Sequence, residues 1–352
     1  MRYKKIGDTE VPAIGQGTGG VYNSAIIRAG IDAGLSLIDT AESYGNEGIV
    51  GEAIKGQRDK VFLSTKFLPE HNGYDDVIKA CEGSLKRLGT DYIDLYSVYY
   101  RNPNIPEEET AKAFDMLIQA GKIKSVGICN TYRPMIANIQ TQAVQTEFNL
   151  LDRSAESKLL PFCSEFNIAV LAYSPLRDYH FLNPDSMMWL REMAGDRTLP
   201  QIILSWLISH VPVIALTSSS KVNHIKRNAQ AGDFQLSEGE LRRIDELFKP
   251  EVVRIPLTQI DITLSADKFP QTKEAAMDCG RWAVKPQDID LKDFKPIKVE
   301  RCAYDDTSRF PSETYEIKEG GLRYWAWRIQ KNEPIPAIVK HRWIQDFRGI
   351  GG

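Results

Sequence analysis

Short apolar runs alternate with amphipathic segments over the first two thirds of the chain. Eight runs rich in β-branched and apolar residues have the length of strands: Ala13–Thr18, Leu35–Thr40, Val61–Lys66, Tyr92–Tyr99, Ile123–Cys129, Ala143–Phe148, Ile168–Tyr173 and Pro212–Thr217. The segments between them show helical spacing of apolar and small residues, as at Val77, Ala80, Cys81, Ser84, Leu85 and Leu88. Strands alternating with helices form a parallel sheet, and eight repeats favour closure into a (β/α)8 barrel over an open sheet. The pattern predicts an α/β barrel.

Two further local patterns frame this barrel. The leading segment Tyr3–Pro12 has the pattern of a hairpin that turns at Gly7-Asp8, and we expect it to plug the bottom of the barrel. At the other end, Ser237–Phe248 has helical spacing, and Glu240 follows Ser237 by three residues. This is the pattern of a capping box, in which the two side chains satisfy backbone amides at a helix start.

Composition and charge narrow the classes of function. Hydrophobic residues make up 42% of the 352 residues and the net charge at pH 7 is −3, so neither nucleic acid nor an anionic membrane is expected as a partner. No apolar run opens the chain or approaches the length of a membrane span. The cysteines are odd in number, scattered and without a CxxC pair: Cys81, Cys129, Cys163, Cys279 and Cys302. These features predict reduced thiols, no metal site and a cytoplasmic protein, and they leave the oligomeric state open.

An acid, a phenol and an amine are expected to converge at one end of the barrel. Chemistry in such barrels sits at the C-terminal ends of the strands. Asp39 ends the second strand, Tyr44 follows it closely, and Lys66 ends the third. An aspartate and a lysine at strand ends also form structural ion pairs. A tyrosine, however, can protonate a carbonyl oxygen if its pKa is lowered, and a nearby ammonium held by a carboxylate is expected to lower that pKa.

Three segments resemble the signatures of the aldo-keto reductase family in the right order. They are Leu37–Gly45 (LIDTAESYG), Ser64–Lys66 (STK) and Arg87–Tyr96 (RLGTDYIDLY). The resemblance spans about residues 3 to 248 and implies a TIM barrel that transfers a hydride between a nicotinamide and the carbonyl or alcohol of a small polar or sugar-like metabolite. It also implies that Asp39, Tyr44 and Lys66 are three of the four family catalytic residues, with Tyr44 as the proton donor.

The fourth catalytic position departs from the family pattern. The family usually has a histidine three residues after Asp-Leu-Tyr, and this chain has Tyr99 there, in Asp94–Tyr99. A phenol can donate a hydrogen bond but titrates far higher than an imidazole. Several interpretations remain: a slower or differently specialised reductase, oxidation of a particular alcohol or sugar, reduction of a conjugated double bond, or a nucleotide-binding regulatory or scaffolding barrel without turnover.

The resemblance also implies a nicotinamide cofactor and assigns most of its contacts. Gly17 and Thr18 belong to the first-strand segment where the backbone approaches the nicotinamide, and Tyr173 is expected to stack on its ring. The carboxamide is expected at Cys129, where the family has serine, at Asn130 and at Gln145, and the pyrophosphate at Ser174, Pro175 and Leu176.

A polar segment after the eighth strand is expected to bind the adenosine half of the cofactor. Hydroxyls and backbone amides at a helix start suit phosphate. The residues concerned are Ser218, Ser219, Ser220, Lys221, His224, Arg227 and Asn228. Asn228 matches the family residue that binds adenine, whereas His224 replaces the usual arginine. Because Lys221 and Arg227 can still meet a 2′-phosphate, NADP is favoured over NAD, which remains possible.

Beyond Lys249-Pro250 the chain has a second set of elements, which divides it into domains 1–248 and 249–352. Their order resembles a ParB/sulfiredoxin-like domain of α+β type: Val252–Ile260, Lys295–Val299, Tyr315–Trp327 and Pro334–Val339. By that resemblance Gly320, Gly321 and Arg323 are candidates for binding a phosphate or a substrate. The sulfiredoxin cysteine is absent, since Leu322 precedes Arg323, and no helix-turn-helix follows, so neither sulfiredoxin activity nor DNA binding is expected.

Overall fold

The computed structural model describes residues 1–102, 104–130, 135–136, 139–157, 159–177, 179, 184–249, 252–255, 297–301, 315–319, 324, 327, 331 and 334–340. The chain divides into two compact units. The first unit comprises Met1–Arg177 and Asp185–Ile244, and the second comprises Asp178–Pro184 and Asp245–Gly352.

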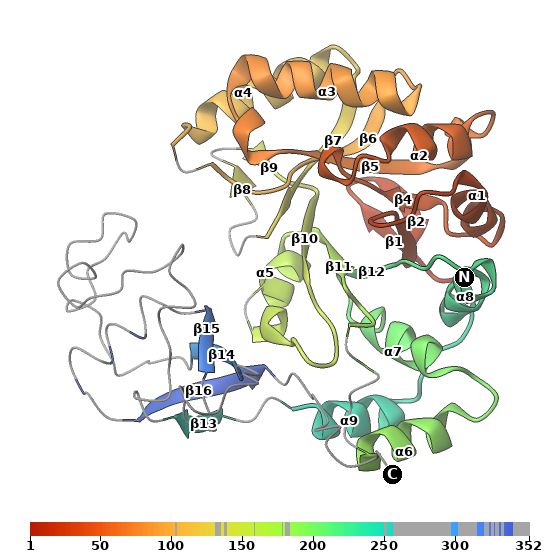
Figure 1. The fold of residues 1–352 in the computed structure, drawn as a ribbon, viewed down its shortest axis with the longest axis vertical. Coiled ribbons are helices and arrows are strands. Elements are labelled where there is room, and N and C mark those ends of the chain that lie inside the picture. The colour runs from red at the N-terminus through yellow and green to blue at the C-terminus, as the bar shows by residue number, and fades with distance from the viewer. Residues whose placement is uncertain are drawn as a thin grey trace, which may run out of the picture. The chain divides into compact units, whose positions relative to one another are not determined.

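Eight parallel strands close into a barrel in the first unit (Figure 1). They are β3 Ile14–Gly17, β4 Leu37–Asp39, β5 Phe62–Phe67, β6 Ile93–Val98, β7 Ile123–Cys129, β10 Ala143–Glu147, β11 Ala169–Tyr173 and β12 Val213–Thr217. The strands neighbour one another in chain order, and β12 closes the barrel by pairing with β3. All eight predicted strands and the predicted barrel are therefore confirmed.

Helices follow the barrel strands and cover the outside of the barrel (Figure 1). They are α1 Ser24–Asp32, α2 Glu47–Ile54, α3 Tyr74–Leu88, α4 Glu107–Gln119, α5 Leu159–Glu165, α6 Pro184–Ala194, α7 Leu199–Leu207, α8 Val222–Ala229 and α9 Glu238–Leu247. In α3 the predicted face is the buried one, with Val77, Cys81 and Leu88 inside. The helix ends at Gly89, whose φ of 63° is the left-handed conformation that glycine adopts without strain.

The N-terminal hairpin closes the bottom of the barrel. Strands β1 Tyr3–Ile6 and β2 Thr9–Pro12 pair antiparallel, and Gly7 takes a φ of 57° in the two-residue turn between them. Ile6 and Val11 are buried in a cluster with residues from the barrel strands: Leu37, Phe62, Leu95, Ala143, Ala169, Leu171, Ile214 and Leu216. Several of these residues begin their strands, so the hairpin covers the N-terminal ends and the predicted plug is confirmed.

The capping box at α9 is also confirmed. The hydroxyl and backbone amide of Ser237 donate to Glu240 Oε2 at 2.8 and 2.6 Å. In return the amide of Glu240 donates to Ser237 Oγ at 3.3 Å. This reciprocal arrangement fixes the start of the helix that follows the last barrel repeat.

The second unit contains four described strands in one sheet. They are β13 Val252–Ile255, β14 Ile297–Arg301, β15 Tyr315–Glu319 and β16 Ile335–Lys340, in the order β13-β16-β14-β15. The β14–β16 pair is parallel and the other two pairs are antiparallel. Tyr324 and Trp327 are buried. Gly320, Gly321 and Arg323 lie outside the described residues.

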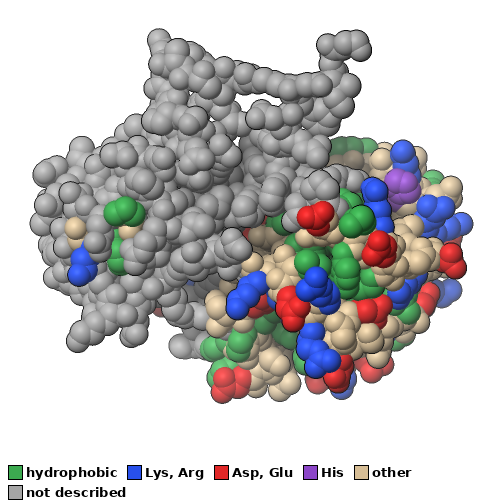
Figure 2. All heavy atoms as spheres, turned by 90° about the horizontal axis from the view of Figure 1, so that it is seen from below, with side chains coloured by type: hydrophobic (Ala, Val, Ile, Leu, Met, Phe, Trp, Pro, Cys, Tyr) green, Lys and Arg blue, Asp and Glu red, His purple; other side chains and the backbone are tan. Residues whose placement is uncertain are grey.

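Charges on the described surface are mixed. On the face shown in Figure 2, basic and acidic side chains are interspersed over the described part of the molecule, in line with the net charge of −3. None of the helices in the described ranges is both long and apolar enough to cross a bilayer. The described part of the face in Figure 2 therefore presents no large patch of one sign.

Candidate active site

A cavity of about 250 Å³ opens at the C-terminal ends of the barrel strands. Eleven of the residues singled out from the sequence line it: Gly17, Thr18, Asp39, Tyr44, Tyr99, Cys129, Asn130, Gln145, Tyr173, Ser174 and Ser218. Tyr100 also lines the cavity and was not singled out beforehand. The described residues contain no group of three or more His, Cys, Asp or Glu side chains placed to bind a metal ion.

A buried ion pair forms the floor of this site. Lys66 Nζ donates to both carboxylate oxygens of Asp39, at 2.8 and 2.9 Å, and to the carbonyl of Thr40 at 2.6 Å. The side chains of Lys66 and Asp39 are only 1% and 3% exposed. Adjacent pairing of β4 and β5 brings the two residues together, with Asp39 opposite Ser64. Ser64 Oγ also donates to Asp39, at 2.9 Å. The pair is therefore fully hydrogen-bonded as well as buried.

Tyr44 lies at the edge of this pair, at the end of the short 3₁₀ helix η1 Glu42–Tyr44. Lys66 Nζ is 5.5 Å from the centre of its ring. Burial raises the pKa of Tyr44 well above its ordinary value, and the negative charge of Asp39 and the neighbouring Tyr99 raise it further. The predicted lowering of this pKa is therefore wrong. The ammonium of Lys66 directs its hydrogen bonds to Asp39 and the backbone, so the phenol remains protonated at neutral pH.

Polar anchors hold the segment that carries Tyr44. Glu42 Oε2 accepts from the amide of Leu68 at 3.3 Å and contacts His71 Nδ1 at 3.1 Å. Asn46 Nδ2 donates to the carbonyl of Thr18 at 2.7 Å. Sequence reasoning missed Glu42 and Asn46. The sequence pattern that could have identified them is a polar residue two positions before and two positions after a tyrosine that follows a buried strand.

Tyr99 stands next to Tyr44 just after β6. The two ring centres are 6.4 Å apart and the planes are nearly perpendicular, at 89°. The amide of Tyr99 donates to the carbonyl of Phe67 at 3.3 Å, which fixes the residue against β5. The ring of Tyr100 lies 4.9 Å from that of Tyr99. Phenols thus occupy the side of the cavity that faces Tyr44.

A chain of hydrogen bonds joins the expected carboxamide contacts to the ion pair. Cys129 Sγ donates to Gln145 Oε1 at 3.1 Å, and Gln145 Nε2 donates to Asp39 Oδ2 at 3.0 Å. Burial raises the pKa of the Cys129 thiol to about 12, so this group remains a neutral donor. Cys129 and Gln145 therefore orient the carboxylate that holds Lys66.

Asn130 and Tyr173 form the adjoining wall. Asn130 has a φ of 56°, and its amide donates to the carbonyl of Gln145 at 2.9 Å. Its side chain accepts from Tyr173 Oη at 2.9 Å and donates to the carbonyl of Tyr99 at 3.2 Å. Ser174, with a φ of 51°, follows Tyr173, and Pro175 and Leu176 come next in the same turn. The turn after β11 thus lies beside the cavity.

The expected adenosine contacts follow β12 and lead into α8. Ser218 lines the cavity, and Ser219 Oγ accepts from the amide of Lys221 at 3.1 Å. Lys221 is the N-cap residue of α8. Ser220, Lys221, His224 and Arg227 are exposed. Asn228 is buried instead, and its Nδ2 donates to Thr217 Oγ1 at 2.8 Å. Hydroxyls and exposed cations thus extend from the cavity along one helix.

Comparisons with known proteins agree with this arrangement. A model of the Aldo/keto reductase family matches residues 20–249. A methylglyoxal reductase of Escherichia coli is 36% identical over 264 residues, which cover 69% of this chain and 93% of the relative. A glyoxal reductase of Bacillus subtilis is 32% identical over 257 residues, covering 69% and 91%. A crystal structure of an aldo/keto reductase from Klebsiella pneumoniae in complex with NADP and acetate has a TM-score of 0.65 at 36% identity, covering 69% of this chain and 93% of that chain.

The chain is an NAD(P)-dependent oxidoreductase. The chain belongs to the Aldo/keto reductase family. The resemblance inferred from the three sequence signatures is thereby confirmed for the barrel.

Proposed function

We propose that this protein is an NADPH-dependent carbonyl reductase in which Tyr44 is the proton donor. The observation that carries the proposal is the position of the Tyr44 phenol beside the buried Lys66–Asp39 pair in an open cavity. A bound nicotinamide supplies the hydride. Tyr44 gives its proton to the carbonyl oxygen, and the Lys66 ammonium, 5.5 Å from the ring centre, offsets part of the free-energy cost that burial and Asp39 place on the phenolate left behind. Asp39 keeps Lys66 charged and oriented.

The proposed substrate is a small polar carbonyl compound, with α-dicarbonyls first among the candidates and sugar-like carbonyls next. The relatives named for methylglyoxal and glyoxal reduction support this class. The cavity of about 250 Å³ is at the small end of ligand sites, which suits a compound of a few carbon atoms beside a nicotinamide.

The free thiols among the described residues, Cys81, Cys129 and Cys163, support action in a reducing cytosol.

The residues at the cavity fit a nicotinamide dinucleotide. Amide groups of Asn130 and Gln145 and the ring of Tyr173 lie on one wall, where a flat carboxamide needs hydrogen bonds and a stacking surface. Exposed Lys221 and Arg227 would hold the 2′-phosphate of NADP. Complexes of the Klebsiella pneumoniae protein with NADP and NADPH support this choice over NAD.

We expect Arg227→Ala to weaken NADPH binding about tenfold or more while changing NADH binding less than twofold, because only NADPH carries the phosphate. Fluorescence titration of both cofactors measures the two dissociation constants, and Lys86→Ala on α3 is the matched control. Equal losses for NADPH and NADH would refute the assignment of Arg227. Substitution of Asn228, which is buried against Thr217, would confound folding with binding.

We further propose that residues 249–352 form a ParB/sulfiredoxin-like α+β domain that binds a nucleotide phosphate through Gly320, Gly321 and Arg323. The four strands of the second unit support the proposal, since each begins within two residues of a segment expected from the sequence. Fluorescence titration of the chain with ATP in place of NADPH tests this nucleotide-binding site. Loss of ATP binding in Arg323→Ala but not in Arg227→Ala is expected, and no ATP binding by the natural chain would refute it.

We expect Tyr99→His to raise kcat/KM for methylglyoxal several-fold and to introduce a titration between pH 6 and 8. Tyr99 stands 6.4 Å from Tyr44, ring centre to ring centre, and imidazole titrates in that range whereas a phenol does not. Steady-state NADPH oxidation across this pH range measures both effects. An unchanged rate and an unchanged profile would place Tyr99 outside the reaction centre. Turnover absent from the natural chain but gained by Tyr99→His would favour the alternative, a nucleotide-binding regulatory or scaffolding barrel.

A further inference from the structure

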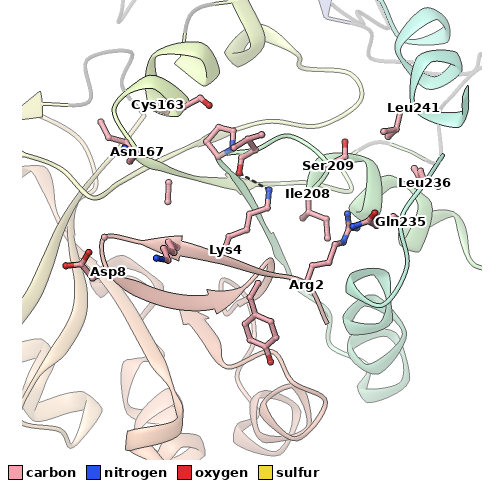
Figure 3. A pocket seen from close by; sticks show the side chains of 18 of the residues that line it. Arg2, Lys4, Asp8, Cys163, Asn167, Ile208, Ser209, Gln235, Leu236 and Leu241 are labelled. Carbon is pink, nitrogen blue, oxygen red and sulfur yellow. Dashed lines mark hydrogen bonds between the residues drawn. The ribbon is translucent and has the colours of Figure 1, made fainter. Parts of the chain in front are cut away.

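A second, larger cavity lies at the opposite end of the barrel from Tyr44. It measures about 920 Å³ and opens where β1 meets the segment after α7 and the loop before β11 (Figure 3). Cationic residues from the first strand and its approach line it, namely Arg2, Lys4 and Lys5. In Figure 3 Lys4 extends across the cavity, Arg2 points toward Gln235, and Asn167 lies on the far wall.

The two inner cations of this cavity are held only by neutral groups. Lys4 Nζ donates to the carbonyls of His210 and Val211, the latter at 3.0 Å. Arg2 donates to Ser205 Oγ at 2.8 Å, while its Nε is buried without a hydrogen-bond partner. Within the described part of the chain neither residue forms an ion pair. Partly buried positive charges without a counterion are unfavourable, and a bound anion would relieve that cost.

The pKa of Lys4 reflects its burial first and this excess of positive charge second. Burial, and next the charge of Arg2, lower the pKa of Lys4 to about 7. The titratable and charged residues that line the cavity with Lys4 are Arg2, Tyr3, Lys5, Asp8, Cys163 and Glu238, and His210 accepts from Lys4 through its carbonyl. Asp8 and Glu238 are exposed, and Glu156 is 3.4 Å from His210.

We propose that this cavity binds a small multivalent anion, a phosphate ester or a polycarboxylate, through the ammonium groups of Lys4 and Lys5 and the neutral amide of Asn167. Its volume admits a molecule larger than a single phosphate. The bound anion bridges the plug hairpin to the loop before β11 and favours the closed barrel, so its binding raises the thermal midpoint. Because this end of the barrel is remote from the strand tips, the anion and NADP+ bind together.

Calorimetric titration of the full chain saturated with NADP+, with inorganic pyrophosphate and separately with citrate, tests this site. One saturable site is expected, with a dissociation constant at least about tenfold higher in Lys4→Gln and raised also in Lys5→Gln. Lys5 is exposed, so its variant keeps the test valid if Lys4→Gln folds poorly. Lys86→Gln on α3 makes the same change outside the cavity and should leave the constant within twofold.

The pH dependence gives a second readout. An anion binds more tightly to the charged form of Lys4, so the loss caused by Lys4→Gln is larger at pH 6 than at pH 8. At each pH, the dissociation constant of Lys4→Gln is divided by that of the natural chain, and this ratio removes the effect of the probe's own titration. Tighter binding of pyrophosphate assigns a phosphate ligand, and tighter binding of citrate assigns a carboxylate. The proposal is overturned if neither probe binds, if NADP+ displaces both, or if neither lysine variant weakens them.

Discussion

We expect Tyr44→Phe to lower kcat for NADPH-dependent reduction of methylglyoxal about a thousandfold, with NADPH affinity within twofold of the natural chain. The substitution removes the proton that the carbonyl oxygen must receive, and general acid catalysis contributes about 10²–10⁴-fold. The ring remains and keeps its edge contact with Tyr99. Tyr44 is not among the residues expected to contact the cofactor, so NADPH affinity should not change. Steady-state kinetics and a fluorescence titration of NADPH separate the two effects.

Tyr100→Phe is the matched control for that variant. It also deletes a phenolic hydroxyl from the cavity lining, on a ring 4.9 Å from that of Tyr99 but without Lys66 beneath it. We expect it to change kcat less than about fivefold, since remote hydroxyl groups contribute to binding and not to proton transfer. Unchanged turnover in Tyr44→Phe, or equal losses in both variants, would exclude Tyr44 as the donor.

Lys66→Met should abolish measurable turnover and also lower the free energy of unfolding by about 3–5 kcal/mol. Both partners of the Lys66–Asp39 pair are almost fully buried, so removing the ammonium leaves the carboxylate without its counterion. Ser64 and Gln145 still donate to Asp39, but they carry no charge. Urea denaturation measures the stability loss, and NADPH oxidation measures the activity.

The double variant Asp39→Asn/Lys66→Met separates these two consequences. Replacing the unpaired carboxylate by an amide removes the uncompensated charge, so we expect recovery of at least half of the lost stability. Turnover should not return, because neither side chain can stabilise the Tyr44 phenolate. Wild-type stability in Lys66→Met would show that the pair contributes little, and recovered turnover in the double variant would contradict the role of Lys66.

The barrel was accessible from the sequence because its signals are local. Each predicted strand is a run of apolar residues that ends within two positions of the observed strand, and the turn at Gly7-Asp8 follows from residue type alone. The convergence of Asp39, Tyr44 and Lys66 followed from one topological fact: parallel strands present their ends on one side of a barrel. The four strands after Lys249 could likewise be predicted from local runs of residues.

The hydrogen bonds within the site could not be predicted from the sequence, because they join distant segments through side-chain geometry. Gln145 donates to Asp39 across 106 residues of sequence, and no local pattern specifies that contact. The pKa of Tyr44 was predicted in the wrong direction for the same reason. The sequence places an ammonium near a phenol, but only the structure shows that Lys66 is engaged by Asp39 and Thr40 and that burial dominates the phenol.

The second cavity, which residues of β1 line, could not be predicted from the sequence either. Arg2 and Lys4 look like ordinary charged residues at the start of a strand. Their burial depends on the closure of the barrel, which brings the segments around Ser205 and His210 against β1. Segments more than 200 residues away in the chain therefore contribute to the burial that lowers the pKa of Lys4.

Transfer of deuterium from NADPH deuterated at C4 of the nicotinamide to methylglyoxal tests the central claim most directly. The account predicts one deuterium on the carbinol carbon of the alcohol product for each NADPH oxidised, and loss of that product in Tyr44→Phe. NADPH that binds to the chain without any transfer, across the panel of α-dicarbonyls and sugar-like carbonyls, would contradict a carbonyl reductase and leave a nucleotide-binding barrel in its place.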